Sequence, residues 1–201
     1  MIVTLLDYGA GNVTSVARAL RRLGAEVRLT ADPAEIEGAT CIVLPGVGHS
    51  AALLTSLDSY GLRAPLRIAL FRGTPFLGIC LGLQALYASS AEASALPGLG
   101  IFQNEVEHLP ATVKLPHMGW NQIHSTRPSA LLAGISANDY FYFAHSFAAP
   151  AGGKETAATC QHGREFAAVI ESGRIFGVQF HPEKSGATGA KLLSNFLRLA
   201  A

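Results

Sequence analysis

The chain is short of charge of either sign and has no block of charged residues. Of its 201 residues, 15 are Lys or Arg and 14 are Asp or Glu, so the formal net charge is only +1. This balance provides no electrostatic footprint for nucleic acid. No basic cluster follows one predicted face, so attraction to an anionic membrane is also not expected. The sequence predicts neither a nucleic acid nor a membrane as partner.

Long hydrophobic runs and paired cysteines are also missing. No run approaches the roughly 18 apolar residues of a membrane helix. The first run, Ile2–Leu6, ends at Asp7 and has no basic segment before it, so we expect no signal peptide. Cys41, Cys80 and Cys160 are odd in number and far apart, which fits neither a disulfide framework nor a zinc site. We expect a cytoplasmic protein with reduced thiols.

Sequence signals for a cofactor are absent too. The seven histidines are scattered without metal-ligand spacing. Gly9 and Gly11 do not begin a dinucleotide fingerprint, because Thr14 stands where the third glycine belongs. There is no phosphate-binding loop of the Walker A type. The sequence therefore predicts no metal and no cofactor.

Apolar runs do alternate with segments of helical period in the first half of the chain. We predict helices over Val13–Leu23, from Asp32-Pro33 and around Leu62–Phe71, and strands over Ile2–Leu6, Glu26–Thr30, Thr40–Leu44 and Pro75–Ile79. Strands that alternate with helices and are almost wholly apolar indicate a parallel sheet covered on both sides. The predicted fold class is α/β, with an open, mostly parallel twisted sheet and helices on both faces.

The second half changes to short strands separated by turns. The predicted strands are Val106–Leu109, Phe141–Ala148, Thr156–Gln161, Phe166–Glu171 and Ile175–Phe180, and a last helix follows over about Ala187–Leu199. We expect these strands to be antiparallel and to extend the same sheet or lie beside it. Without a repeat, a low-complexity segment or a linker, residues 1–201 are expected to form a single domain.

The functional site is expected at one edge of this sheet, because sites in open α/β folds form beyond the carboxyl ends of the strands. Four segments should reach that edge: Asp7–Asn12, Pro45–Gly48, Cys80 and His181–Glu183.

Cys80 stands between Gly78 and Gly82, where a predicted strand turns into a helix expected over Leu81–Ala88. Glycines at these positions let backbone segments approach closely. A helix beginning directly after the thiol would favour the thiolate. Without further evidence, a cysteine at such a position is more often a buried core residue than a catalytic one.

His181, Pro182 and Glu183 strengthen the catalytic interpretation. Proline favours extended backbone before it, and residues two apart in extended chain point to the same side. Glu183 should then reach the imidazole of His181 and orient it, as the third member of a catalytic triad does. A surface His and Glu in a loop is the alternative. With Cys80 at the same edge, we predict a Cys80–His181–Glu183 triad.

A nucleophile that attacks a carbonyl carbon also needs donors for the oxyanion. The N–H of Leu81 is free of an intrahelical partner if a helix starts there. The turn Pro45-Gly46-Val47-Gly48 can present the N–H of Val47 as a second donor.

These motifs resemble those of the class I glutamine amidotransferases. Within the family, the chain is similar to the glutaminase subunits of imidazole glycerol phosphate synthases. The shared motifs, in the family's order, are Asp7–Asn12, Leu44–Gly48, Gly78–Gln84, Pro116–Asn121, Tyr142–Ser146 and His181–Gly186. The run Pro116-His117-Met118-Gly119-Trp120-Asn121 is the one that narrows the resemblance to this subunit.

The resemblance implies an activity and a partner. Cys80 would attack the side-chain amide of glutamine and form a thioester, whose hydrolysis gives glutamate. The ammonia would pass to a cyclase subunit, a (β/α)₈ barrel that makes imidazole glycerol phosphate and aminoimidazole carboxamide ribonucleotide in histidine biosynthesis. The two subunits would form a heterodimer.

The resemblance also assigns further residues. Gly48, Gln84 and Ser146 would bind glutamine. Asn12, Trp120 and Asn121 would face the cyclase subunit.

Three alternatives stay open. The chain could be the glutaminase of another class I amidotransferase, such as that of anthranilate or pyridoxal phosphate synthesis. A free-standing cysteine hydrolase acting on peptides or amides should turn over without a partner. A non-enzymatic partner subunit would need a broken triad, whereas Cys80, His181 and Glu183 are all present.

Overall fold

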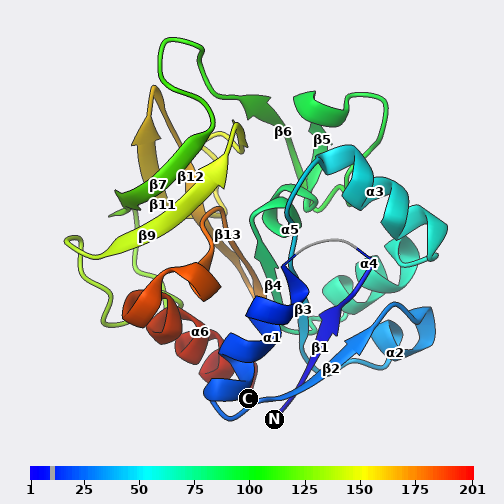
Figure 1. Cartoon of the computed structure of the whole chain (residues 1–201). Coiled ribbons are helices and arrows are strands. Elements are labelled where there is room, and N and C mark those ends of the chain that lie inside the picture. The colour runs from blue at the N-terminus through cyan, green and yellow to red at the C-terminus, as the bar shows by residue number, and fades with distance from the viewer. Residues whose placement is uncertain (10–11) are drawn as a thin grey trace.

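A computed structural model describes residues 1–9 and 12–201 of the chain. Its main feature is an eight-stranded sheet (Figure 1) with the order β2-β1-β3-β4-β13-β12-β11-β8. The strands are β1 (Ile2–Leu6), β2 (Glu26–Thr30), β3 (Ile42–Leu44), β4 (Phe76–Ile79), β8 (His124–Ser125), β11 (Thr156–His162), β12 (Arg164–Ser172) and β13 (Ile175–Val178). The pairings from β2 to β13 are parallel, and those from β13 to β8 are antiparallel. The predicted fold class is confirmed.

Two smaller sheets lie beside the main one. One has the order β10-β6-β5 and the other pairs β7 with β9. Their strands are β5 (Tyr87–Ser90), β6 (Phe102–His108), β7 (His117–Gln122), β9 (Tyr140–His145) and β10 (Phe147–Ala148). The strands of the second half were predicted to extend the main sheet or to lie beside it. Both occur, since β8, β11, β12 and β13 extend the main sheet and the other strands form the two smaller sheets.

Helices cover both faces of the main sheet (Figure 1). On one face, α1 (Val13–Arg22) and α6 (Gly186–Ala200) share a core with the strands, and on the other lie α2 (Pro33–Glu37), α3 (Ser50–Ser59) and α4 (Arg63–Phe71). Short turns of helix are α5 (Leu81–Gln84), η1 (Ala91–Ala93) and η2 (Pro182–Lys184). Within the described residues, no helix combines the length and apolar character needed to cross a membrane.

The helix predicted over Leu81–Ala88 is wrong, because α5 ends at Gln84 and the chain enters β5 instead. The carbonyl of Ala85 accepts from Leu99 N–H at 2.7 Å, and that of Leu86 accepts from Ile101 N–H at 2.8 Å. These carbonyls are therefore occupied by a distant segment rather than by the next helical turn. Tertiary pairing has overridden the local helical pattern.

Some elements have no counterpart in the sequence-based prediction. They are α3 and the strands β5, β7 and β8. In α3 the only large apolar residues are Leu53, Leu54 and Leu57, and small or polar residues fill the other positions, so the apolar stripe of the helix is short. In β7 the buried face is formed largely by polar side chains, which conceals the alternation expected of a strand.

The glycines around Cys80 permit three backbone segments to meet. A Cβ at Gly78 would collide with the backbone of Gly82, and a Cβ at Gly82 would collide with the carbonyl of Leu44 at the end of β3. A Cβ at Gly46 would lie 2.6 Å from that of Leu81. Close approach, rather than freedom of φ, is the reason for glycine at these three positions, since only Cys80 in this turn has a positive φ.

Gly82→Ala should therefore destabilise the protein, because the added methyl group has no space beside Leu44. Overpacking of this kind costs about 1–3 kcal/mol. Chemical denaturation measures the loss. Gly152→Ala is the matched control, because no heavy atom lies within 4 Å of its built Cβ. Equal stabilities of the two variants would contradict this packing argument.

Candidate active site

Cys80 occupies a strained turn at the end of β4. Its φ is 53° and its ψ is −108°. Among the described residues other than glycine, only Cys80 has a positive φ. The N–H of Cys80 donates to Val178 O at 2.8 Å, which ties the turn to β13. Strained backbone at a strand-to-helix turn is typical of residues whose side chain must be presented to a ligand.

His181 and Glu183 lie next to this turn, just beyond β13. The Nδ1 atom of His181 is 2.9 Å from Oε1 of Glu183, and both side chains are almost fully buried. The pairing predicted from the sequence is present. The predicted reason is only half right, because His181 is extended but Pro182–Lys184 forms the 3-10 turn η2. That turn, rather than extended chain, returns the carboxylate to the imidazole.

The ionisation of His181 is governed by its two partners. Burial has the largest single effect and lowers the pKa, but hydrogen bonds and charges of Cys80 and Glu183 together outweigh it and raise the pKa of His181 to about 10. Since Nδ1 faces Glu183, Nε2 is the nitrogen left for the thiol of Cys80. A histidine charged at neutral pH beside a thiol favours the thiolate.

Glu183 is held as a carboxylate by two donors. Asn12 donates through Nδ2 to Oε1 at 2.9 Å, and the same oxygen faces His181. Burial raises the pKa of Glu183, but these hydrogen bonds and the charge of His181 outweigh it and lower the pKa below its ordinary value. Asn12, predicted to face a partner, therefore has a contact inside the site. Ala10 and Gly11 of the same predicted segment lie outside the described residues.

Two glutamines connect Cys80 to the neighbouring strand β10. Gln179 is fully buried, and its Nε2 lies 3.5 Å from Sγ of Cys80. Gln84 donates through Nε2 to Oε1 of Gln179 at 3.0 Å and to the carbonyl of Phe147 at 2.8 Å. Sequence reasoning missed Gln179. Its signal was an amide within the otherwise apolar run Ile175–Phe180.

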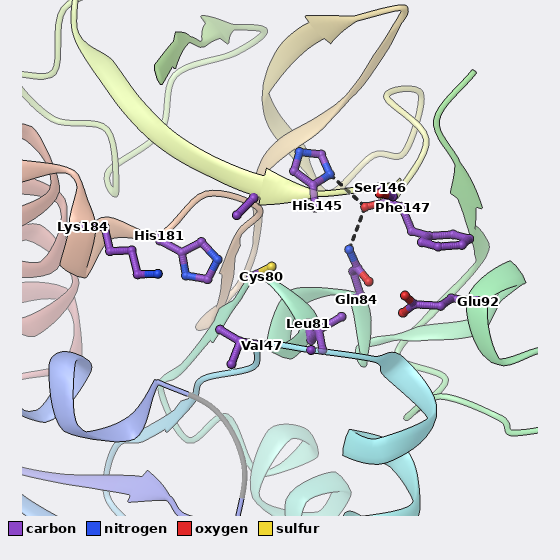
Figure 2. A pocket seen from close by; sticks show the side chains of 12 residues that line it. Val47, Cys80, Leu81, Gln84, Glu92, His145, Ser146, Phe147, His181 and Lys184 are labelled. Atoms are coloured by element: carbon purple, nitrogen blue, oxygen red, sulfur yellow. Dashed lines mark hydrogen bonds between the residues drawn. The ribbon is translucent and has the colours of Figure 1, made fainter. Parts of the chain in front are cut away.

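A pocket of about 220 Å³ opens above Cys80 (Figure 2). The predicted site residues Val47, Gly48, Cys80, Leu81, Gln84, Ser146 and His181 all line it. Glu92 and Lys184 line it as well and were not predicted. Glu92 follows β5 and accepts from the N–H of Ser50 at 2.8 Å through one oxygen. It was the single carboxylate in a stretch of small residues, which is a weak signal.

The arrangement also suits an oxyanion. α5 begins at Leu81, so the N–H of Leu81 has no intrahelical acceptor. The packing of Gly46 against Leu81 brings the turn that carries Val47 to the same place. Both residues lie beside Cys80 in Figure 2.

The remaining predicted partner residues differ in exposure. Trp120 on β7 is 56% exposed and packs against Tyr142 on β9 with ring centroids 6.0 Å apart. Asn121 points to the other side, where its Nδ2 donates to Gln161 O at 3.2 Å. Trp120 thus presents an aromatic surface, whereas Asn121 bonds within the chain.

The other two cysteines are structural. Cys41 and Cys160 are fully buried, and burial raises the pKa of each thiol to about 12. No cluster of three or more His, Cys, Asp or Glu side chains suited to a metal ion occurs in the described part of the chain.

Comparison with known proteins identifies the family of the chain. The model of the family "Glutamine amidotransferase class-I" matches residues 4–200. The chain is 47% identical to "Imidazole glycerol phosphate synthase subunit HisH" of Moorella thermoacetica, over 96% of this chain and 93% of that protein. It is 42% identical to the subunit of the same name from Methanothermobacter thermautotrophicus, over 98% of each chain.

Solved structures show the same fold at lower identity. One described as "Crystal structure of glutamine amidotransferase" has a TM-score of 0.79 at 22% identity, covering 100% of this chain and 99% of that chain. Another, of PurLQS from Thermotoga maritima, has a TM-score of 0.75 at 19% identity and covers 98% of this chain and 97% of that chain.

Removing both partners of His181 should change the direction of its pKa shift from upward to downward. In a Cys80→Ala, Glu183→Gln double variant the charges of both partners are gone and burial becomes the dominant effect, so we expect the pKa of His181 to fall below its ordinary value of 6.5. NMR titration of the imidazole measures it. The Cys80→Ala single variant, which keeps Glu183, should lie between the double variant and the wild type. An imidazole still charged above neutral pH in the double variant would refute this account.

Proposed function

The chain belongs to the class I glutamine amidotransferase family, and from this membership we propose that it is the glutaminase subunit of an imidazole glycerol phosphate synthase. It would work in histidine biosynthesis as one subunit of a cytoplasmic heterodimer, with residues 1–201 forming a single domain. The observation that carries the proposal is Cys80, held at positive φ beneath the pocket with His181 and Glu183 beside it.

The residues of the site account for each step of glutamine hydrolysis. The thiolate of Cys80 attacks the side-chain amide carbon, and the N–H groups of Val47 and Leu81 hold the oxyanion. The imidazolium of His181 gives its proton to the leaving ammonia as the C–N bond breaks, which leaves a thioester on Cys80. His181 then takes a proton from water as the water attacks the thioester carbon, and breaking of the C–S bond releases glutamate and restores the thiolate of Cys80 beside the imidazolium of His181. Glu183 keeps the imidazole oriented throughout.

The rim of the pocket suits the amino-acid end of glutamine. Glu92 lies on the side of the pocket away from His181 (Figure 2), where its carboxylate can attract the α-ammonium group. Gln84 has a buried Oε1 without a partner among the described residues, and it offers an acceptor for an N–H group. Gly48 and Ser146 line the same space and would bind through their backbone.

The partner surface we propose is the outer face of the β7–β9 sheet. Met118, Trp120 and Tyr140 are exposed there, and a cluster of large apolar side chains on a surface is typical of an interface. This sheet is joined to the site, because the carbonyl of Tyr142 accepts from the N–H of His181 at 2.8 Å. A (β/α)₈ cyclase subunit docked there would receive ammonia before water protonates it.

Cys80→Ala should abolish glutamine hydrolysis while the chain stays folded and bound to its cyclase subunit. Ammonium salt added to that complex should still support formation of imidazole glycerol phosphate, because this route bypasses the thioester. The two rates are measured in parallel on one preparation. A folded variant that keeps half of its glutaminase activity would refute the role of Cys80. Activity of the isolated wild-type chain unchanged by the cyclase subunit would favour a free-standing hydrolase.

Trp120→Ala should weaken the complex with the cyclase subunit. Aromatic anchors contribute about 2 kcal/mol or more to an interface, which corresponds to a loss of about 30-fold in affinity. Titration calorimetry compares the variant with Phe71→Ala, a control that removes an aromatic side chain 73% exposed on α4. Equal affinities of the two variants would move the interface away from β7.

A further inference from the structure

A row of hydrogen-bonded side chains leads from half-buried Asn121 on β7 through two buried histidines to the edge of the pocket. Nδ2 of Asn121 lies 3.2 Å from Nε2 of His117, and Nδ1 of His117 lies 3.0 Å from Nε2 of His145. Nδ1 of His145 lies 2.9 Å from the carbonyl oxygen of Phe147 in β10. Three side chains and one carbonyl thus form a continuous hydrogen-bonded row.

The direction of every hydrogen bond in this row is determined by its ends. The Phe147 carbonyl can only accept, so Nδ1 of His145 carries a proton. A neutral imidazole has one N–H, so Nε2 of His145 accepts from Nδ1–H of His117. Nε2 of His117 is then an acceptor as well, and it must receive an N–H from Asn121.

Asn121 is oriented to supply that N–H. Its Oδ1 accepts from the N–H of Gln122 at 2.8 Å, and its Nδ2 also donates to the carbonyl of Gln161 at 3.2 Å. The amide therefore presents its nitrogen to His117. All donors and acceptors along the row agree with this single assignment.

Both histidines are neutral in this environment. Burial, with a smaller contribution from His162, lowers the pKa of His117 to about 4. Burial and the neighbouring His117 lower the pKa of His145 to about 3, against a smaller opposing effect of the Phe147 carbonyl. The titratable groups that act on the pair are His162 of β11, stacked on His117 at 4.1 Å, and His181, which acts on His145.

The row ends on a carbonyl that also holds Gln84. The Phe147 carbonyl accepts from both His145 and Gln84 (Figure 2), and Gln84 in turn bonds to Gln179, whose amide faces Sγ of Cys80. His145, Ser146 and Phe147 themselves line the pocket. Moving this carbonyl would displace one wall of the pocket and turn Gln84.

We propose that Asn121, His117 and His145 form a positioning relay, which fixes the Phe147 carbonyl and through it Gln84 in the arrangement that binds glutamine. This inference rests on the proposed glutaminase function. The three are positioning residues, because none of them is needed for the chemical steps at Cys80.

Asn121→Asp tests the relay by reversing it. The carboxylate can only accept, so a neutral His117 must donate to it through Nε2–H and accept from His145 through Nδ1. Because a carboxylate also favours a charged imidazole, the test is made at a pH high enough to keep His117 neutral. His145 then turns a lone pair toward the Phe147 carbonyl, and that hydrogen bond is lost. Asn104→Asp is the matched control, with the same change of charge at an exposed position of β6.

Nitrogen NMR of ring-labelled histidine in the full-length chain gives the first readout. In the wild type and Asn104→Asp, His117 and His145 should both carry their proton on Nδ1 at neutral pH. In Asn121→Asp, at the pH that keeps His117 neutral, both protons should be on Nε2. Wild-type tautomers other than Nδ1–H, or tautomers unchanged by Asn121→Asp, would overturn the relay whatever the activity of the protein.

Kinetics of the complex with saturating cyclase subunit give the second readout. Loss of one such hydrogen bond should raise KM for glutamine by up to about tenfold in Asn121→Asp, with a smaller change in kcat. The ammonia-driven reaction should be unchanged.

These outcomes separate the two proposals. A wild-type complex that does not hydrolyse glutamine would overturn the proposed function, while the tautomers still report on the relay. Switched tautomers with an unchanged KM would overturn the positioning role alone.

Discussion

The parallel pairing of β4 with β13 is the interaction on which the site depends. Gly78 pairs with Gly177 and Ile79 with Val178, so two segments about a hundred residues apart end side by side at one edge. Cys80 continues this pairing through its N–H to Val178, which fixes Cys80 relative to the strand that leads to His181. A slip of one residue in this register would turn the side chains to the opposite face and separate Cys80 from His181 and Glu183.

Beneath the pocket, ionised and polar groups are buried together, which is unfavourable unless each has partners. His181 and Glu183 balance each other, and Asn12 adds a donor. Two buried atoms without a partner among the described residues, Oε1 of Gln84 and Oε2 of Glu183, belong to this same region. Buried polar atoms without a partner are uncommon in folded proteins, and Gln84, which lines the pocket, carries one of them.

Local patterns in the sequence were enough to predict the parallel half of the sheet and the meeting of His181 and Glu183 beside Cys80, because apolar strands, glycine turns and the His-Pro-Glu run depend on near neighbours. Ile2–Leu6 and Glu26–Thr30 match β1 and β2 in full. The helix over Leu81–Ala88 failed because Leu99 and Ile101 capture the carbonyls it needed. Gln179 and the His117–His145 pair were missed for a related reason, since their meaning lies in contacts between strands that no local pattern encodes.

The histidines of this site also limit the range of pH in which the fold is most stable. His117 and His145 have pKa values below the ordinary 6.5, so the unfolded chain binds more protons and stability is lost as the pH falls below that value. The lowered pKa of Glu183 acts in the same direction in acid. His181, with its raised pKa, does the opposite, and its contribution is lost as the pH rises from 6.5 toward about 10. The free energy of unfolding, followed across pH, should pass through a maximum near neutrality, where His117 and His145 cause the fall on the acid side and His181 causes the fall on the alkaline side.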